Sequence, residues 1–277
     1  MPTWSRRSWK SLATNRSPDM SIIFAVSGVV IKELYRRKDF YVLFILTALM
    51  TLLLGSVNFF NDSSVFRYVK EICLLLIWIS SLVISITTAG RQIPAEKESR
   101  TIFPLLAKPV SRAQMIVGKF LGCWFASGLM LLVFYGFFVI VSGSREHQWP
   151  MSIYAQAFWL HWACLAVIIA MALLGSIVFT AFSSNVTICF CIVIGIFVVG
   201  GHLNTAALEM GEPGASILYV LYYVIPHLEW YDVRPLVIHN QGVIRWIDVA
   251  GATLYAAVYT STLLGATWVI FRRKSLA

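Results

Sequence analysis

Charged side chains are scarce in this chain, at 13% of its 277 residues, whereas 58% of the residues are hydrophobic. Soluble domains carry about 25% charged residues, so this balance excludes an ordinary soluble enzyme or binding domain. The sequence also lacks a Walker-type glycine loop, an HExxH motif, a nucleophile elbow and clustered carboxylates in its apolar runs. We therefore expect no catalytic residue, no metal site and no cofactor in this chain.

Cysteine and buried ionisable groups are also few. The five cysteines lie in or beside apolar runs rather than in polar loops, which argues against a disulfide framework. Cys189 and Cys191 are two positions apart, so on a helix they point to roughly opposite faces and do not form a metal-binding pair. His161 lies well inside an apolar run and is either a packed, hydrogen-bonded residue or a proton relay. Ion-coupled transporters usually carry such groups to bind the driving ion, so we expect this protein to draw its energy from outside its own chain.

Long hydrophobic runs are what the sequence has in abundance. A spanning helix needs about 20 apolar residues, and six stretches meet this length or nearly so. They are residues 40–59, 72–89, 120–141, 157–182, 186–203 and 247–271. The uncharged link FSSNV predicts a tight hairpin between the fourth and fifth. The sequence therefore predicts an all-α polytopic membrane protein with six transmembrane helices.

The distribution of basic residues predicts the orientation. Alternate polar segments carry 17 Lys and Arg residues on one side of the membrane and 5 on the other. The richer side is cytoplasmic by the positive-inside rule, which places both termini in the cytoplasm and explains the net charge of +9 without nucleic acid. Residues 1–39 form a basic cytoplasmic tail in which 17–38 are expected to be an interfacial helix, with Ser17 as N-cap and Pro18 in the first turn. Residues 40–277 form the transmembrane domain.

Residues 204–246, between the last two spans, are too long for a turn and are expected to form a small external helical cap. Their apolar run 215–225 is too short to cross the bilayer. This run and the residues that follow it, up to 231, contain several aromatic side chains whose polar tips suit the level of the lipid headgroups. These side chains form either an aromatic belt or a substrate gate, and the candidate residues are Tyr219, Tyr222, Tyr223, Pro226, His227 and Trp230, with Tyr231 beside them.

The largest internal cytoplasmic segment, residues 91–119, is charged and contains three prolines. Glu96, Lys97, Glu98 and Arg100 supply charges to an expected short helix, and apolar residues from Ile102 to Leu106 could dock on a partner or on the membrane surface. Pro104 opposes one regular helix and Pro109 ends whatever precedes it. Ser111 and Gln114 match a capping box at the start of the third span. From composition alone, the segment is either a docking element or a solvated loop.

The stretch EKESRTIFPLLAKPVSRAQMIVGKFLG resembles the conserved segment of type-2 ABC transporter permeases, which combines an acidic start, T-[IL]-x-x-L-L, K-P-V-S-R and a final G-K. The matching residues are Glu96, Thr101, Leu105, Leu106, Lys108, Pro109, Ser111, Arg112, Gly118 and Lys119. Arg100 stands where many members have Gly. KELYRRKDF before the first span and YVIPHLEWYDV before the last also resemble the family, so the likeness covers nearly the whole chain.

The resemblance implies a six-helix subunit that forms a homodimer or close heterodimer and binds two separate ATP-binding-cassette ATPase subunits, which hold ATP and Mg²⁺. It also implies that residues 91–119 contain the coupling helix and that the protein is an exporter of a bacterial plasma (inner) membrane. The resemblance does not identify the transported substrate. The contacts to the ATPase would come from Glu96, Glu98, Arg100, Thr101, Leu105, Leu106, Lys108 and Pro109. Two alternatives are an ion-coupled secondary transporter and a non-transporting membrane scaffold of an assembly complex.

The predicted orientation can be tested by labelling single introduced cysteines with a reagent that does not cross the membrane. A cysteine at Gly211 or Ser144 should react from outside, and one at Ser99 only from the cytoplasm, because of the uneven distribution of basic residues. Reaction of the Ser99 position from outside would contradict the six-span topology.

Overall fold

The computed structural model describes residues 24, 26–32, 41–42, 44–45, 48–49, 52, 63–98, 111–146, 149–179, 181–209, 214–238 and 242–273. Within these residues the regular structure is entirely helical, with no β-strand. Most of the predicted first span, 40–59, lies outside the described residues, as do Ser17, Pro18 and most of the predicted interfacial helix. The described residues in both segments are helical.

Among the described residues, five helices are long and apolar enough to cross a membrane. They are α4 (Ser63–Glu98), α6 (Arg112–Glu146), α7 (Met151–Val178), α8 (Phe182–Glu209) and α11 (Trp246–Arg273). Each contains or largely overlaps one of the predicted spans from the second to the sixth. The all-helical, membrane-spanning architecture is therefore confirmed, whereas the count of six spans stays a prediction.

The predicted position of the turn between the fourth and fifth spans is wrong. α7 ends at Val178, where the Phe179 N–H donates to the Gly175 carbonyl, and α8 already begins at Phe182. FSSNV therefore forms the start of α8. Its Asn185 is fully buried and donates from Nδ2 to the Ala172 carbonyl at 3.1 Å, which ties α8 to α7. An amide buried in this way stabilises the helix pair only because it has partners, so it is part of the packing and not of a turn.

α4 is longer than predicted, because residues 91–98 continue it instead of forming a separate short helix. Pro94 lies inside α4 and has no N–H to give to the Gly90 carbonyl four residues earlier. Asn185 of α8 supplies a replacement, since its Nδ2 lies 3.4 Å from the Gly90 oxygen. α8 likewise continues past its predicted end at residue 203 to Glu209. In both helices the extension carries the backbone beyond the apolar run.

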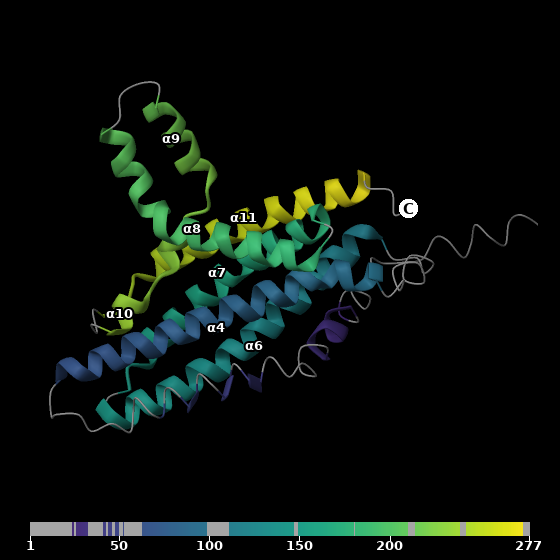
Figure 1. The fold of residues 1–277 in the computed structure, drawn as a ribbon. Helices are drawn as coiled ribbons and strands as arrows, with labels where there is room; N and C mark the ends of the chain where they lie inside the picture. Colours follow the sequence, from purple (N-terminus) through teal and green to yellow (C-terminus); the bar gives the residue numbers. More distant parts are fainter. Residues whose placement is uncertain are drawn as a thin grey trace, which may run out of the picture.

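α7 is the central helix of the bundle. It is apolar on all sides and is buried without interruption from Ala163 to Ala170. A helix that is hydrophobic all round needs neighbours on every face, and α7 packs against α4, α6, α8 and α11. Figure 1 shows α4, α6, α7 and α11 lying roughly alongside one another, with the second half of α8 turning away from them. α8 and α11 leave most of their apolar surface exposed to the surrounding membrane.

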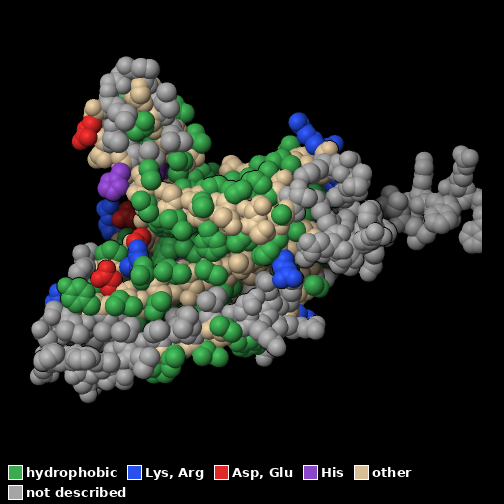
Figure 2. Space-filling view, viewed as in Figure 1, with side chains coloured by type: hydrophobic (Ala, Val, Ile, Leu, Met, Phe, Trp, Pro, Cys, Tyr) green, Lys and Arg blue, Asp and Glu red, His purple; other side chains and the backbone are tan. Residues whose placement is uncertain are grey.

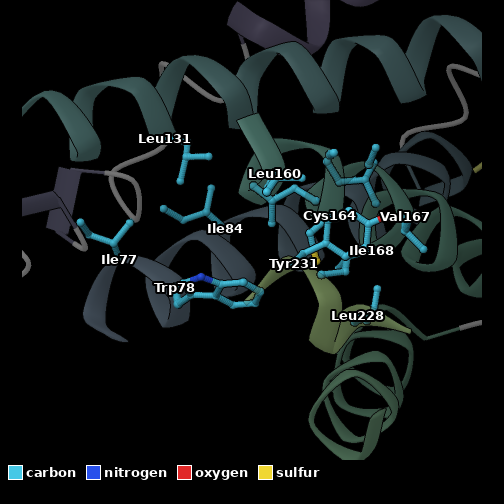
Figure 3. Packing of buried hydrophobic residues seen from close by; sticks show 14 of the residues in the cluster. Ile77, Trp78, Ile84, Leu131, Leu160, Cys164, Val167, Ile168, Leu228 and Tyr231 are labelled. Atoms are coloured by element: carbon cyan, nitrogen blue, oxygen red, sulfur yellow. The ribbon is translucent and has the colours of Figure 1, made fainter. Parts of the chain in front are cut away.

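The segment between α8 and α11 contains short helices, and we call it the cap, while its place outside the membrane stays a prediction. α9 (Gly214–Val224) matches the short apolar run and packs against the end of α8, and Figure 1 shows the two as an arm that projects from the bundle. After it come the short 3₁₀ helix η1 (Leu228–Tyr231) and α10 (Arg234–Ile238). Figure 3 shows Leu228 and Tyr231 of η1 lying against the α7 residues around Cys164 and Ile168. The cap is thus anchored on the central helix.

The surface agrees with a membrane location. In the face drawn in Figure 2, hydrophobic side chains and backbone cover the middle of the bundle, and charged side chains lie toward its two ends. Large apolar residues such as Leu129, Ile194 and Leu254 are more than half exposed. In water such a surface would favour aggregation, whereas in lipid it has no such cost.

Two glycines of α6 offer a matched test of the packing. A Cβ on Gly128 would overlap the Trp162 indole of α7, whereas a Cβ on Gly136 would meet nothing within 4 Å. We expect Gly128→Leu to destabilise the protein by about 1–3 kcal/mol, the usual cost of overpacking. Gly136→Leu should be close to neutral. Melting temperatures in detergent measure both, and equal values would show that α6 and α7 do not pack as described.

Candidate functional site

The predicted contact residues for the ATPase lie mostly beyond what the structure describes. Glu96 and Glu98 belong to the last turns of α4, by their backbone. Arg100, Thr101, Leu105, Leu106, Lys108 and Pro109 lie outside the described residues. Their roles stay predictions, but the helices on either side of this segment, α4 and α6, are described in detail.

The start of α6 has the predicted capping box. The Gln114 N–H donates to Ser111 Oγ at 3.2 Å, and the Ser111 N–H donates to Gln114 Oε1 at 2.9 Å. These reciprocal bonds satisfy backbone donors that a helix N-terminus otherwise leaves unpaired. These bonds therefore fix the N-terminus of α6 at Ser111.

Arg112 joins the start of α6 to the end of α11. Its Nη1 donates to the Phe271 carbonyl at 2.8 Å and to the Arg272 carbonyl at 3.2 Å. Its guanidinium also lies 5.4 Å from the centre of the Phe271 ring. The last carbonyls of a helix lack intrahelical partners, so Arg112 caps α11 across the interface.

Lys119 joins α6 to the end of α4. It is buried, and its Nζ donates to the Gln92 carbonyl at 2.9 Å. One residue earlier, the Gly118 carbonyl accepts a 2.9 Å hydrogen bond from Ser27 in the helical segment 26–32. Because the distribution of basic residues predicts that this end of the bundle is cytoplasmic, we call these contacts of Arg112, Gly118 and Lys119 the cytoplasmic clamp. Through them the first two turns of α6 hold α4, α11 and the N-terminal segment together.

A second polar group lies inside the bundle, around His161. His161 is fully buried, with Nε2 2.9 Å from Ser81 Oγ of α4 and Nδ1 3.4 Å from Tyr135 Oη of α6. Its ring stacks on Trp78 with centroids 4.5 Å apart. Both ring nitrogens thus have partners, and His161 is the packed, hydrogen-bonded residue that was one of the two sequence-based interpretations.

The cap reaches this group through Arg234. The Arg234 guanidinium lies 5.9 Å from the centre of the Trp78 ring and makes paired hydrogen bonds of 2.7 and 2.6 Å to the two carboxylate oxygens of Asp232. These bonds raise the pKa of Arg234 above its ordinary value, so the group stays charged. A cation over an indole face is favourable, and Trp78 is therefore held between His161 on one side and Arg234 on another.

The candidate cap or gate residues come together with two residues of α11. The His227 ring stacks on the Trp230 ring, with ring centroids 5.0 Å apart, and its centroid lies 4.4 Å from that of Tyr222. The ring centroids of Tyr222 and Tyr223 are 5.5 Å apart. Tyr255 Oη accepts the His227 N–H at 3.0 Å, and Tyr259 Oη donates to the Tyr223 carbonyl at 3.3 Å. We call these six side chains the outer aromatic cluster: Tyr222, Tyr223, His227, Trp230, Tyr255 and Tyr259.

The remaining candidates lie at the edge of this cluster. Tyr219 is half-buried on α9, one turn before Tyr222 and Tyr223. Pro226 leads into η1, where its carbonyl accepts the Leu228 N–H at 2.9 Å. Within η1, Tyr231 donates to the Ala252 carbonyl at 2.6 Å, and burial raises the pKa of its hydroxyl. The cluster is therefore attached to α11 as well as to α9.

Comparison with known families agrees with this arrangement. The family model of ABC-2 family transporter proteins matches residues 29–276. The chain belongs to the ABC-2 transporter family. The resemblance inferred from residues 96–122 is thus confirmed. ABC-2 permeases are normally non-enzymatic membrane subunits that work with a separate ABC ATPase subunit. A search for similar curated proteins found no match.

Within the described ranges, no group of three or more His, Cys, Asp or Glu residues of this ABC-2 chain is placed to hold a metal ion. What the structure does contain is a set of polar contacts at helix ends, which join helices that are otherwise in apolar contact.

Sequence reasoning missed Tyr255, Tyr259 and Trp78 as parts of the polar groups, and it missed the Asp232–Arg234 pair. The four-residue spacing of the two tyrosines puts them on one helix face, which is a usable signal. Nothing in the sequence indicates that this face meets the cap. Trp78 lies in an apolar run, and the sequence around it does not distinguish a residue buried in the bundle from one that faces lipid.

Two arginines of the ABC-2 chain allow a test of how the cap is anchored. Arg234→Met would leave the half-buried Asp232 carboxylate without its partner and remove the cation from Trp78, which should cost about 1–3 kcal/mol. The control is Arg245→Met, because the Arg245–Asp248 pair is exposed and screened by solvent, so its loss should have little effect. Thermal unfolding in detergent measures both variants. A larger loss for the Arg245 variant would contradict the anchoring role of Arg234.

Proposed function

We propose that this chain is the membrane permease subunit of an ATP-driven exporter, and that a separate ATPase subunit, which holds ATP and Mg²⁺, drives it through residues 91–119. The observation that carries this proposal is the cytoplasmic clamp. The family match supplies the class of protein, and the clamp supplies a physical route from the coupling segment to the membrane helices.

The route runs through α6. A partner that pushes on the segment between Glu98 and Ser111 displaces the end of α4 and the start of α6. Because Arg112 is bonded to the end of α11 and Lys119 to Gln92 of α4, these helix ends move as a unit. Rigid-body rotation of helices packed in this way is a common response to nucleotide-driven closure of a partner. The coupling segment thus acts on a preassembled set of helices.

The permease is proposed to act as a homodimer or close heterodimer, with one ATPase for each copy, in a bacterial plasma membrane and with both termini in the cytoplasm. The basic residues at the start of α6 and the end of α11 support this orientation, since they lie at the same end of the bundle. The opposite end, with the cap, then faces outward. There the outer aromatic cluster is proposed as the gate that substrate passes on release.

Neither alternative is favoured by a specific observation. A secondary transporter needs an ionisable group on an aqueous path, and His161 is instead enclosed by Trp78, Ser81 and Tyr135. A non-transporting scaffold needs no connection between its cytoplasmic segment and its spans. The clamp provides such a connection, and it is built from residues that match the family pattern.

The coupling role of the segment can be tested by two changes that leave the spans intact. Glu96→Lys reverses the charge of a proposed contact, and Leu105→Asp with Leu106→Asp places charge at a proposed apolar docking surface. Both should lower ATP-driven transport at least tenfold, while the permease still inserts. The ATPase subunit should dissociate or hydrolyse ATP without responding to substrate. Transport in vesicles and co-purification of the ATPase are the measurements.

The control is Glu209→Lys, the same charge reversal at an exposed position on the outer part of α8. It should leave both ATPase capture and transport close to those of the unmodified protein. Wild-type transport and ATPase affinity in both coupling variants would show that residues 96–106 do not form the coupling element.

A further inference from the structure

A lateral groove lies between α6, α7 and α11, on a part of the bundle that no feature above uses. Its volume is about 300 Å³ and its lining is almost entirely apolar. Small residues of α7 and α11, including Ala163 and Ala256, form its floor, and Phe120 and Trp124 of α6 form one wall. The groove faces the region that the membrane occupies.

The walls of the groove are rigid. Trp124 Nε1 donates to the Trp162 carbonyl and Trp162 Nε1 donates to the Trp124 carbonyl, both at 3.0 Å, and the two rings stack at 4.4 Å. Because each indole N–H is already bonded, rotation of either ring into the groove would leave a polar group unpaired in an apolar region. One end of the groove is closed where Trp159 Nε1 donates to Thr253 Oγ1 at 2.9 Å across α7 and α11. The groove is therefore a formed feature and not a gap that side chains can close.

The dimensions fit a single hydrocarbon chain. Along α11 the lining runs from Thr253 to Leu264, which at 1.5 Å per residue is about 17 Å, or roughly one leaflet of a ~30 Å hydrocarbon core. A volume of about 300 Å³ spread over that length leaves a cross-section of roughly 20 Å². A helix with its side chains is about 10 Å wide, so the backbone of another span does not fit inside the groove.

The open end of the groove lies next to the basic end of the bundle. Val117 and Leu264 line this end, five residues from Arg112 and eight from Arg272 along their helices. Arg272 and Arg273 are exposed in the last turn of α11, and Arg112 meets that turn through its bonds to the Phe271 and Arg272 carbonyls. α6 has no acidic residue in its first turn, and the only acidic residue of α11 is at its other end. This end therefore favours an anionic group.

The N-terminal segment does not account for the groove either. The described helical residues 26–32 pack on α6 through Ser27 at Gly118 and through Val30 at Gly122. Neither glycine lines the groove, which uses Val117, Phe120 and Leu121 of the same helix.

We propose that this groove binds an acyl chain of an anionic phospholipid, with the lipid phosphate at Arg272, which lies at the edge of the helix face that lines the groove, and the chain between α6, α7 and α11. The phosphate pairs with the guanidinium group, and the chain buries apolar surface against a preformed, dry wall. Such a lipid would stabilise the helix ends that the cytoplasmic clamp joins. This proposed lipid-binding site does not depend on whether the protein transports lipid.

The test is binding of phosphatidylglycerol and phosphatidylcholine with identical acyl chains to the full-length purified protein, measured by native mass spectrometry. We expect phosphatidylglycerol to bind at least tenfold more tightly. Ala257→Trp should fill the groove and weaken that binding at least tenfold, because Ala257 is an exposed part of its lining. Val258→Trp is the control, since Val258 is exposed on the same helix but does not line the groove.

The headgroup is tested separately. Arg272→Gln should lower the affinity for phosphatidylglycerol to that for phosphatidylcholine, whereas Arg273→Gln, on the opposite face of α11, and Arg245→Gln, at its other end, should have little effect. If Ala257→Trp does not fold, Ser261→Leu narrows the same groove with a smaller side chain and should also weaken binding. Equal binding of the two lipids, or equal binding by the Ala257 and Val258 variants, would overturn the proposal. So would conversion of a dimer into a monomer by Ala257→Trp with lipid binding unchanged, which would assign the groove to a second copy.

Discussion

The structure depends on one constraint, which is that a helix inside a membrane must satisfy its polar groups within the protein. α7, the central helix, meets this constraint because most of the polar side chains that it buries have partners on neighbouring segments, while Ser176 donates to the Leu173 carbonyl of α7 itself. His161 is bonded to Ser81 and Tyr135, and the Ala172 carbonyl accepts from Asn185. The same logic explains Pro94, whose missing N–H leaves the Gly90 carbonyl to a side chain of α8. Polar contacts therefore determine which helices lie together, while apolar packing fills the space between them.

The two ends of the bundle are held by different sets of contacts. At the end with the clamp, Arg112 and Lys119 bind backbone carbonyls of α11 and α4, so they hold whole helix ends rather than single side chains. At the opposite end, the cap contacts the bundle through Arg234 over Trp78, through the rings around His227 and through hydrogen bonds such as that from Tyr231 to the Ala252 carbonyl. Both ends thus use directional hydrogen bonds to carbonyls, and at the clamp the donors of these bonds are charged.

The end of the bundle with the cap contains one further contact, between the cap and α8. The Glu229 carboxylate pairs with His227 at 3.1 Å, and a Cβ at Gly200 of α8 would come within 3.0 Å of its other oxygen. A side chain at Gly200 would therefore have to displace that oxygen by a few tenths of an ångström. Figure 1 shows the second half of α8 turning away from the bundle toward α9. Glu229 thus joins His227 of the cap to the surface of α8.

The sequence by itself determined the helical membrane fold class, the approximate positions of the spans from the second to the sixth, and the capping box at Ser111, because hydropathy, helix length and local capping depend on residues close together in the chain. It also determined the family, through the residues around Lys108 and Pro109. It misplaced the turn at FSSNV, because Ser and Asn suit a turn and a buried helix contact equally well. Only the tertiary structure decided the partners of Asn185, Arg112, Lys119 and Trp78. Each of these residues has its partner on another helix, and local sequence patterns do not show which helix faces meet.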